Sequence, residues 1–291
     1  METAARAAGK RNMLVRRAHL AQRRIARLDP AVQAILWSAL AGILFVFLNS
    51  LLRELARKLP PFEVQCLRYV LGLVVMLPLV FREGPAAYRP QNVAGQFTRG
   101  AVHTAGLCIW FSAVTHISIA DTTAIGFTSP IFVMLGAAFF FKEPMRWARW
   151  VASLLGFAGV LIVVAPKLTG QGGGYLLVML ASAPVFAASF LITKALARKE
   201  RAEVIVVWQS ISVALLSLPL ALMGWQWPTA GQWALFAVAG VLGSAGHYCL
   251  TRSFARAEIS ATQSVKFLDL VWATLLGWLW FGDAPSTSTI L

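Results

Sequence analysis

The chain has 291 residues, of which 58% are hydrophobic and only 13% are charged, and its mean hydropathy is +0.68. This apolar share exceeds what the core of a soluble domain holds, and it falls in blocks long enough to cross a hydrocarbon layer of roughly 30 Å as helix. The pattern predicts an all-α polytopic membrane protein. The net charge of +14 does not indicate a nucleic-acid partner, because the basic residues lie between the apolar blocks and in the first thirty positions.

The apolar blocks predict nine spans through the bilayer. The first block follows a long basic leader and is too long for the apolar part of a signal peptide, so we interpret it as a membrane helix. Only a few residues follow Pro285, and we expect a tenth helix to be truncated or only begun at Leu291. The expected spans are 31–52, 61–81, 98–117, 121–141, 147–166, 174–193, 203–224, 231–250 and 261–281.

The distribution of basic residues predicts the orientation of the chain. Lys and Arg beside membrane spans are retained on the cytoplasmic side. An inside N-terminus puts the basic tail 1–30 and most of the 26 Lys and Arg residues there, including Arg99. The opposite side receives only Arg53, Arg57, Lys58 and Lys167. We therefore expect a multi-pass protein of a bacterial inner membrane with a cytoplasmic N-terminus.

The sequence repeats itself after about 140 residues. Each copy holds five spans, and because five is odd, the second copy must enter the membrane from the opposite side. The predicted fold is therefore two inverted five-helix repeats, at 31–166 and 171–291, which is how many secondary transporters build a site near the membrane midplane. Identical residues align Gly100, Ala105, Gly106, Ile119, Thr122, Phe127, Leu135 and Phe141 with Gly240, Ala245, Gly246, Ile259, Thr262, Phe267, Leu275 and Phe281.

Several short segments resemble a known family. Residues Phe141–Pro144 read Phe-Lys-Glu-Pro, are followed by Trp150 and Gly156–Val160, and are echoed by Phe281–Pro285. Arg68 in the second span fits the same pattern. These residues are similar to the EamA family of the drug/metabolite transporter superfamily. The resemblance implies a ten-helix bundle with a central cavity that moves amino-acid-like, nucleoside-like or vitamin-like metabolites, and it does not identify the solute.

Charged residues inside spans are the first candidates for a solute site, because each costs about 3 kcal/mol at mid-bilayer. Lys266 and Asp269 are three residues apart and share one helical face. The repeat aligns them with Gly126 and Ser129, and Pro130 removes a backbone donor where a helix could bend around a solute. We expect a polar or zwitterionic solute to pass between spans four and nine at these residues. Alternatively, the charges only neutralise each other and the proline makes a packed kink.

Other polar residues inside spans are further candidates. Arg68 aligns with Gln209, and it could contact the solute or act in gating. His103 and His247 could exchange protons near neutral pH, or could simply be hydrogen-bonded. We expect Glu143 and Asp283, one and two residues before a proline at a span end, to bond exposed amides or a neighbouring Arg rather than a solute. Residues expected to line a cavity with aromatic and hydrogen-bonding groups are Trp110, Tyr248 and Gln263.

Two other classes of membrane protein compete with a secondary transporter. An embedded enzyme for lipid or isoprenoid substrates would need clustered catalytic groups, and the sequence has no His-Glu-x-x-His, Gly-x-Ser-x-Gly or Asp-rich metal motif. A passive channel would repeat a ring of like charges or a filter loop. The cysteines lack the spacing of a zinc site or a redox pair. We therefore expect alternating access in a lipid bilayer, with a small-molecule solute, no cofactor and no metal, and a homodimer as an open alternative.

Overall fold

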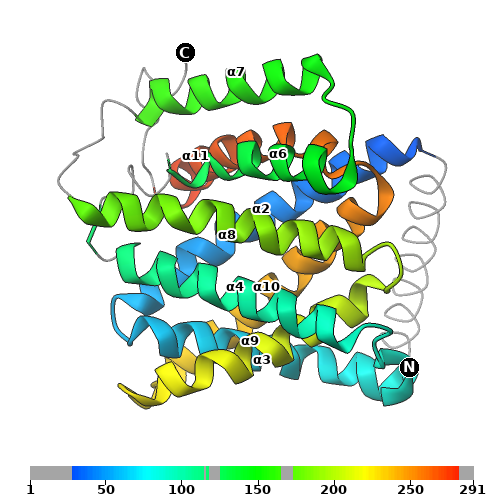
Figure 1. The fold of residues 1–291 in the computed structure, drawn as a ribbon. Coiled ribbons are helices and arrows are strands. Elements are labelled where there is room, and N and C mark those ends of the chain that lie inside the picture. The colour runs from blue at the N-terminus through cyan, green and yellow to red at the C-terminus, as the bar shows by residue number, and fades with distance from the viewer. Residues whose placement is uncertain (1–27, 115, 118–124, 165–172, 282–291) are drawn as a thin grey trace, which may run out of the picture.

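The computed structural model describes residues 28–114, 116–117, 125–164 and 173–281 (Figure 1). The elements in this part of the chain are α2 (Pro30–Ala56), α3 (Pro61–Glu83), the 3-10 helix η1 (Pro85–Tyr88), α4 (Val93–Val114), α6 (Ser129–Phe141), α7 (Trp147–Val164), α8 (Gly174–Leu196), α9 (Ala202–Leu222), α10 (Ala230–Arg256), the 3-10 helices η3 (Ile259–Thr262) and η4 (Ser264–Phe267), and α11 (Leu268–Phe281). Five of them, α2, α3, α8, α9 and α10, are long and apolar enough to cross a membrane. The predicted all-α membrane fold is confirmed.

Local sequence explains where several helices begin. The Asp29 carboxylate accepts a hydrogen bond from the Ala31 amide at 2.7 Å, and Pro30 occupies the first turn of α2, where no backbone donor is needed. At α10, Thr229 and Gln232 bond each other's backbone amides in a capping box. Such caps satisfy end groups that a lipid environment could not.

Most of the large helix contacts join a helix of one repeat to a helix of the other repeat. Helix α2 packs on α10, and its repeat counterpart α8 packs on α4. Helices α3 and α9 pack on each other, while α3 also contacts α10 and α9 also contacts α4. Helix α6 packs on α8, and their repeat counterparts α11 and α2 pack on each other in the same way. Each contact thus has a counterpart in the other half, as inverted repeats require, and α3, α4, α9 and α10 lie next to one another (Figure 1).

Glycines of the repeat make two of the closest helix crossings. A Cβ on Gly240 of α10 would lie 2.8 Å from the backbone of Leu71 in α3. The aligned residue in the first repeat is Gly100 of α4, where a Cβ would collide with the side chain of Ser212 in α9. Only glycine permits this approach, because a larger residue would push the paired helices apart. The aligned glycines therefore mark corresponding crossings in the two halves.

The structure differs from the predicted spans in three places. Helix α4 begins at Val93, ahead of the expected start. The ninth span is interrupted, because η3 and η4 precede α11. Helix α6 begins only at Ser129, and Pro130 lies in its first turn, where a missing N–H leaves no bond unmade. Residues 1–27 of the predicted basic tail, the expected outer residue Lys167, and residues 282–291, which hold Asp283 and the expected start of a tenth helix, lie outside the described residues.

Candidate functional site

A cluster of polar side chains lies buried where α3, α4, α9 and α10 meet, and we call it the central cluster. None of its members is more than 6% exposed. Burying this many polar groups is costly unless they bond one another. The members are Arg68 and Tyr69 of α3, Arg99 and His103 of α4, Gln209 of α9 and His247 of α10.

Gln209 joins the two halves of the central cluster. Its Oε1 accepts a hydrogen bond from Arg99 Nη2 at 2.9 Å. Its Nε2 lies 3.5 Å from the Tyr69 hydroxyl and 3.3 Å from His247 Nε2. Because the amide oxygen is taken by Arg99, the amide nitrogen is the donor toward both other groups. Arg99 Nε also donates to the Thr193 hydroxyl of α8.

The two histidines face each other inside the cluster. Their ring centroids are 5.5 Å apart. His103 Nε2 lies 2.8 Å from the Tyr69 hydroxyl, and His103 Nδ1 lies 3.2 Å from Ser189 Oγ of α8. By contrast, His247 Nδ1 is buried without a hydrogen-bond partner among the described residues. The structure thus brings together the two histidines that the sequence offered as candidates for proton exchange.

Corresponding aromatic residues of the two repeats flank these histidines. The ring of Phe186 on α8 lies edge-on to His103, with centroids 5.5 Å apart. The ring of Phe45 on α2 lies edge-on to His247, with centroids 5.1 Å apart. Since α2 and α8 are repeat counterparts, each repeat places a phenylalanine of its first helix edge-on to one histidine of the central cluster.

A narrow cavity of about 10 Å³ lies beside the central cluster, which is room for about one water molecule. The Arg68 guanidinium lies 3.9 Å from the centre of the Tyr69 ring, and its Nε has no hydrogen-bond partner among the described residues. The residues that line the cavity are Arg68, Tyr69, Gly72, Val206, Gln209, Ser210, Gly240, Gly243, Ser244 and His247. This lining holds a cation and several donors but no carboxylate, so it suits a ligand rich in hydrogen-bond acceptors.

The predicted ion pair of Lys266 and Asp269 forms next to the central cluster. Lys266 Nζ lies 3.7 Å from Asp269 Oδ2, and the two side chains are 18% and 23% exposed. Lys266 belongs to η4 rather than to a continuous helix, and Asp269 lies in the first turn of α11. Lys266 Nζ is also 5.3 Å from the centre of the Phe45 ring, which in turn contacts His247. The Phe45 ring therefore lies between this ion pair and His247 of the central cluster.

The expected wall on span four lies apart from the central cluster. Phe127 and Phe267, which the repeat aligns, stack with ring centroids 5.6 Å apart between α6 and α11. Gly126 is exposed, whereas Pro130 is buried at the start of α6. The Ser129 hydroxyl is buried and has no partner among the described residues. No hydrogen bond or ring contact in the described part of the chain joins these residues to the central cluster.

Three other predicted lining residues have local partners instead. Gln263 Nε2 donates to a carbonyl of η3 at 3.0 Å. The Tyr248 ring lies edge-on to Trp37 at 6.0 Å, and the Trp110 ring lies edge-on to Phe111 at 4.9 Å. Of the predicted site residues, the structure gathers Arg68, Gln209, His103 and His247 in one place.

Sequence reasoning missed Tyr69 and Arg99. Arg99 was expected at the cytoplasmic end of the span 98–117, but α4 begins at Val93 and puts this side chain in its second turn, 1% exposed. A usable signal stands at Asn92, whose side chain accepts a hydrogen bond from the Gly95 amide at 2.8 Å. An Asn ahead of an apolar run is a common helix start, and it would have moved the predicted start well ahead of Arg99, away from the helix end.

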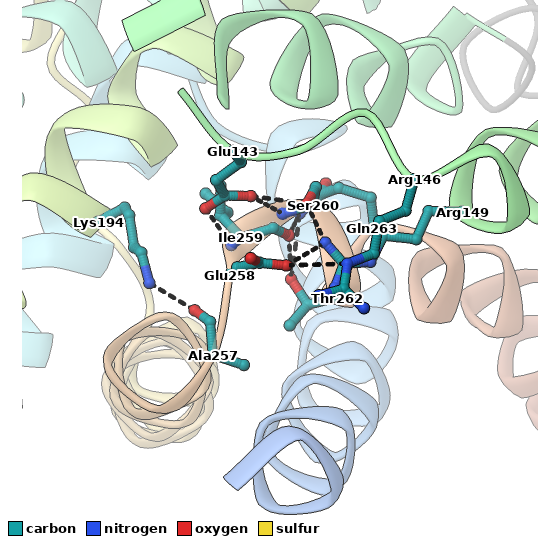
Figure 2. A network of polar contacts seen from close by, with 10 residues as sticks. All are labelled: Glu143, Arg146, Arg149, Lys194, Ala257, Glu258, Ile259, Ser260, Thr262 and Gln263. Atoms are coloured by element: carbon teal, nitrogen blue, oxygen red, sulfur yellow. Dashed lines mark hydrogen bonds and ion pairs between the residues drawn. The ribbon is translucent and has the colours of Figure 1, made fainter. Parts of the chain in front are cut away.

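A second polar network joins the α6–α7 connection to the segment between α10 and η4 (Figure 2), and we call it the loop network. The Glu143 carboxylate accepts hydrogen bonds from the Ile259 amide at 2.9 Å, the Ser260 amide at 3.0 Å and the Ser260 hydroxyl at 2.6 Å. Arg149 pairs with Glu258 and donates to the Ser260 hydroxyl at 2.8 Å. The prediction that Glu143 bonds exposed amides is confirmed.

Comparisons with known proteins cover nearly the whole chain. The model of the EamA-like transporter family matches residues 32–165 and again residues 173–291. A riboflavin transporter of Rhizobium johnstonii is 37% identical, over 88% of this chain and 85% of its own length. An S-adenosylmethionine uptake transporter of Rickettsia felis is 28% identical, over 82% and 81%. A pseudopaline exporter of Pseudomonas aeruginosa is 29% identical, over 90% and 93%.

The fold also recurs in a solved structure. A crystal structure of another protein, 21% identical, superposes with a TM-score of 0.77 over 88% of this chain and 92% of its own. At this identity the likeness concerns the fold alone. It agrees with the helical arrangement described above.

Proposed function

Because this chain belongs to the EamA-like transporter family, we propose that it is a secondary carrier that moves small polar heteroaromatic metabolites by alternating access. The coarser conclusion, a multi-pass membrane protein that transports metabolites, follows from the family and from the named transporters that are similar to it. The finer proposal places the solute at the central cluster, in a conformation in which the helices have moved apart to widen the cavity of about 10 Å³ beside it.

The observation that carries this proposal is the correspondence of the two halves around one polar centre. Arg68, Arg99, Gln209 and His247 come from four helices that form two repeat pairs, α3 with α9 and α4 with α10. Carriers with inverted repeats bind their solute at the interface of the repeats, and the repeats rock about it. A buried cluster at that interface is therefore the expected place for a solute.

The chemistry of the lining supports an acceptor-rich solute with a flat ring. Arg68 and His247 offer unpaired donors, and Tyr69 offers an aromatic face. Carbonyl oxygens and ring nitrogens of flavin-like or nucleoside-like compounds are acceptors of this kind. A relative that is 37% identical is named a riboflavin transporter, which makes riboflavin the first solute to test.

Counterflow in proteoliposomes tests the proposal. Vesicles that contain the purified protein and are loaded with unlabelled riboflavin should take up labelled riboflavin faster than vesicles without internal riboflavin. The rate of uptake should saturate as external riboflavin is raised. Excess S-adenosylmethionine should compete poorly, because its sulfonium cation meets no carboxylate in the cavity lining. Flux that does not saturate and does not respond to internal riboflavin would indicate a pore and would contradict a carrier.

We also propose an inner-membrane location with the N-terminus inside, on the evidence of the charge asymmetry. This orientation puts Trp227, which is 80% exposed, on the outer side and the exposed Lys199 on the cytoplasmic side. A membrane-impermeant thiol reagent added to intact cells should label Trp227→Cys and leave Lys199→Cys unlabelled. The reverse pattern would invert the topology.

A further inference from the structure

We infer that His103 binds a transported proton, and that the proton and the solute occupy the central cluster together. The inference rests on the proposed function, because it concerns the same buried centre. Its basis is a difference in how the two histidines are hydrogen-bonded.

The hydrogen bonds of His247 leave no room for an added proton. Gln209 Oε1 accepts from Arg99, so the Gln209 amide nitrogen is a donor, and it lies 3.3 Å from His247 Nε2. His247 must therefore present a lone pair at Nε2 and carry its hydrogen on Nδ1. A proton added at Nε2 would put two donors face to face, and turning the amide would break its bond to Arg99.

The hydrogen bonds of His103 do accommodate an added proton. One ring nitrogen faces the Tyr69 hydroxyl at 2.8 Å and the other faces the Ser189 hydroxyl at 3.2 Å. A hydroxyl donates or accepts by rotation of its hydrogen, and its oxygen carries two lone pairs. The neutral ring can donate to one hydroxyl and accept from the other, and the protonated ring can donate to both. His103 can thus gain and lose a proton without moving any heavy atom.

The charges around His103 link the proton to the solute. The charged or titratable groups that face it are Arg68 and Tyr69 on α3, Arg99 on its own helix and His247 on α10. Helices α8 and α9 present the uncharged Ser189, Phe186 and Gln209. No carboxylate faces this ring among the described residues.

A proton on His103 would add positive charge beside two guanidinium groups, where the low dielectric strengthens repulsion. An acceptor-rich solute against Arg68 offsets that charge, so each ligand favours binding of the other, as linkage requires. Proton and solute should therefore cross the membrane in the same direction.

Two transport assays separate proton coupling from solute movement. Counterflow needs no proton gradient, whereas accumulation does. With one proton per solute, an external pH one unit lower should drive about tenfold accumulation of riboflavin by the parent protein. His103→Gln should lose this accumulation more completely than it loses counterflow, so the ratio of accumulation to counterflow should fall. The matched control is His116→Gln, which changes an exposed histidine outside the central cluster and should accumulate riboflavin like the parent.

The outcomes distinguish this inference from the proposed function. Equal accumulation by His103→Gln and the parent would overturn the inference. Counterflow by the parent with no response to a pH gradient would also overturn it, and would leave the carrier function standing. Absence of riboflavin counterflow in the parent would overturn the proposed function and the inference with it.

A binding measurement decides the matter if His103→Gln loses both activities. Riboflavin added to the purified parent in weakly buffered detergent should draw about one proton from solution per bound solute. Binding without proton uptake would contradict the inference.

Discussion

The central cluster and the loop network are both polar regions, but they differ in how completely their groups are bonded. In the loop network, the Glu143 carboxylate accepts three hydrogen bonds and Arg149 faces Glu258. Nearby, Lys194 donates to the backbone carbonyls of Phe254 and Ala257. In the central cluster, several buried donor atoms have no partner among the described residues, namely Arg68 Nε, Arg99 Nη1 and His247 Nδ1.

This difference separates a structural network from a site prepared for a ligand. A buried group without a partner costs about 1–3 kcal/mol, and a ligand that bonds it recovers that cost. A network with its groups paired gains nothing from a ligand and holds its segments in place. Damage to the loop network should therefore lower stability, whereas changes of unpaired groups in the central cluster should lower solute affinity.

The largest effect is expected from Gly240→Ala, which pushes α10 away from α3 beside the central cluster. The new methyl group would meet the α3 backbone at 2.8 Å, and overpacking of this kind costs about 2–3 kcal/mol. The control is Gly231→Ala in the same helix, where a Cβ meets nothing within 4 Å. The temperature at which the detergent-solubilised protein unfolds should fall for the first variant alone. Equal stability of the two variants would contradict a tight crossing.

An intermediate effect is expected from Glu143→Ala, which breaks the loop network. Loss of hydrogen bonds to a charged acceptor should lower the free energy of unfolding by about 2 kcal/mol. Glu54→Ala is the control, because Glu54 pairs with exposed basic residues, such as Lys58 at 2.8 Å, and such pairs are worth about 0–1 kcal/mol. Similar losses in the two variants would show that the loop network is not a special source of stability.

The smallest effect on stability is expected from Arg68→Met. Its Nε is unpaired and no ion pair holds it in the described part of the chain, so the unfolding temperature should change little. Riboflavin affinity should fall about tenfold, the loss of one hydrogen bond to a charged donor. Arg82→Met, at the exposed end of the same helix, should change neither quantity. A loss of stability as large as that of Glu143→Ala would erase the distinction between the two regions.

The repeat in the sequence predicted more of the architecture than any single motif. Residues that align at the repeat shift take corresponding places in the structure, because a two-fold relation gives equivalent positions equivalent surroundings. Gly100 and Gly240 make matching crossings, and Phe127 stacks on its aligned partner Phe267. The candidate site was less predictable, since Lys266 and Asp269 are near neighbours in sequence, whereas the central cluster joins residues of four helices.

By itself, the sequence determined the membrane class, the course of most helices and the inverted pairing of the two halves. These follow from apolar block length, local caps and the odd number of spans in each copy, all of which are properties of short segments or of their order. Only the tertiary structure decided which polar groups meet. Arg99 and Gln209 are hydrogen-bonded at 2.9 Å because α4 and α9 cross at this point. The crossing depends on small residues of both helices, and the sequence of one helix does not show which residues of the other it will meet.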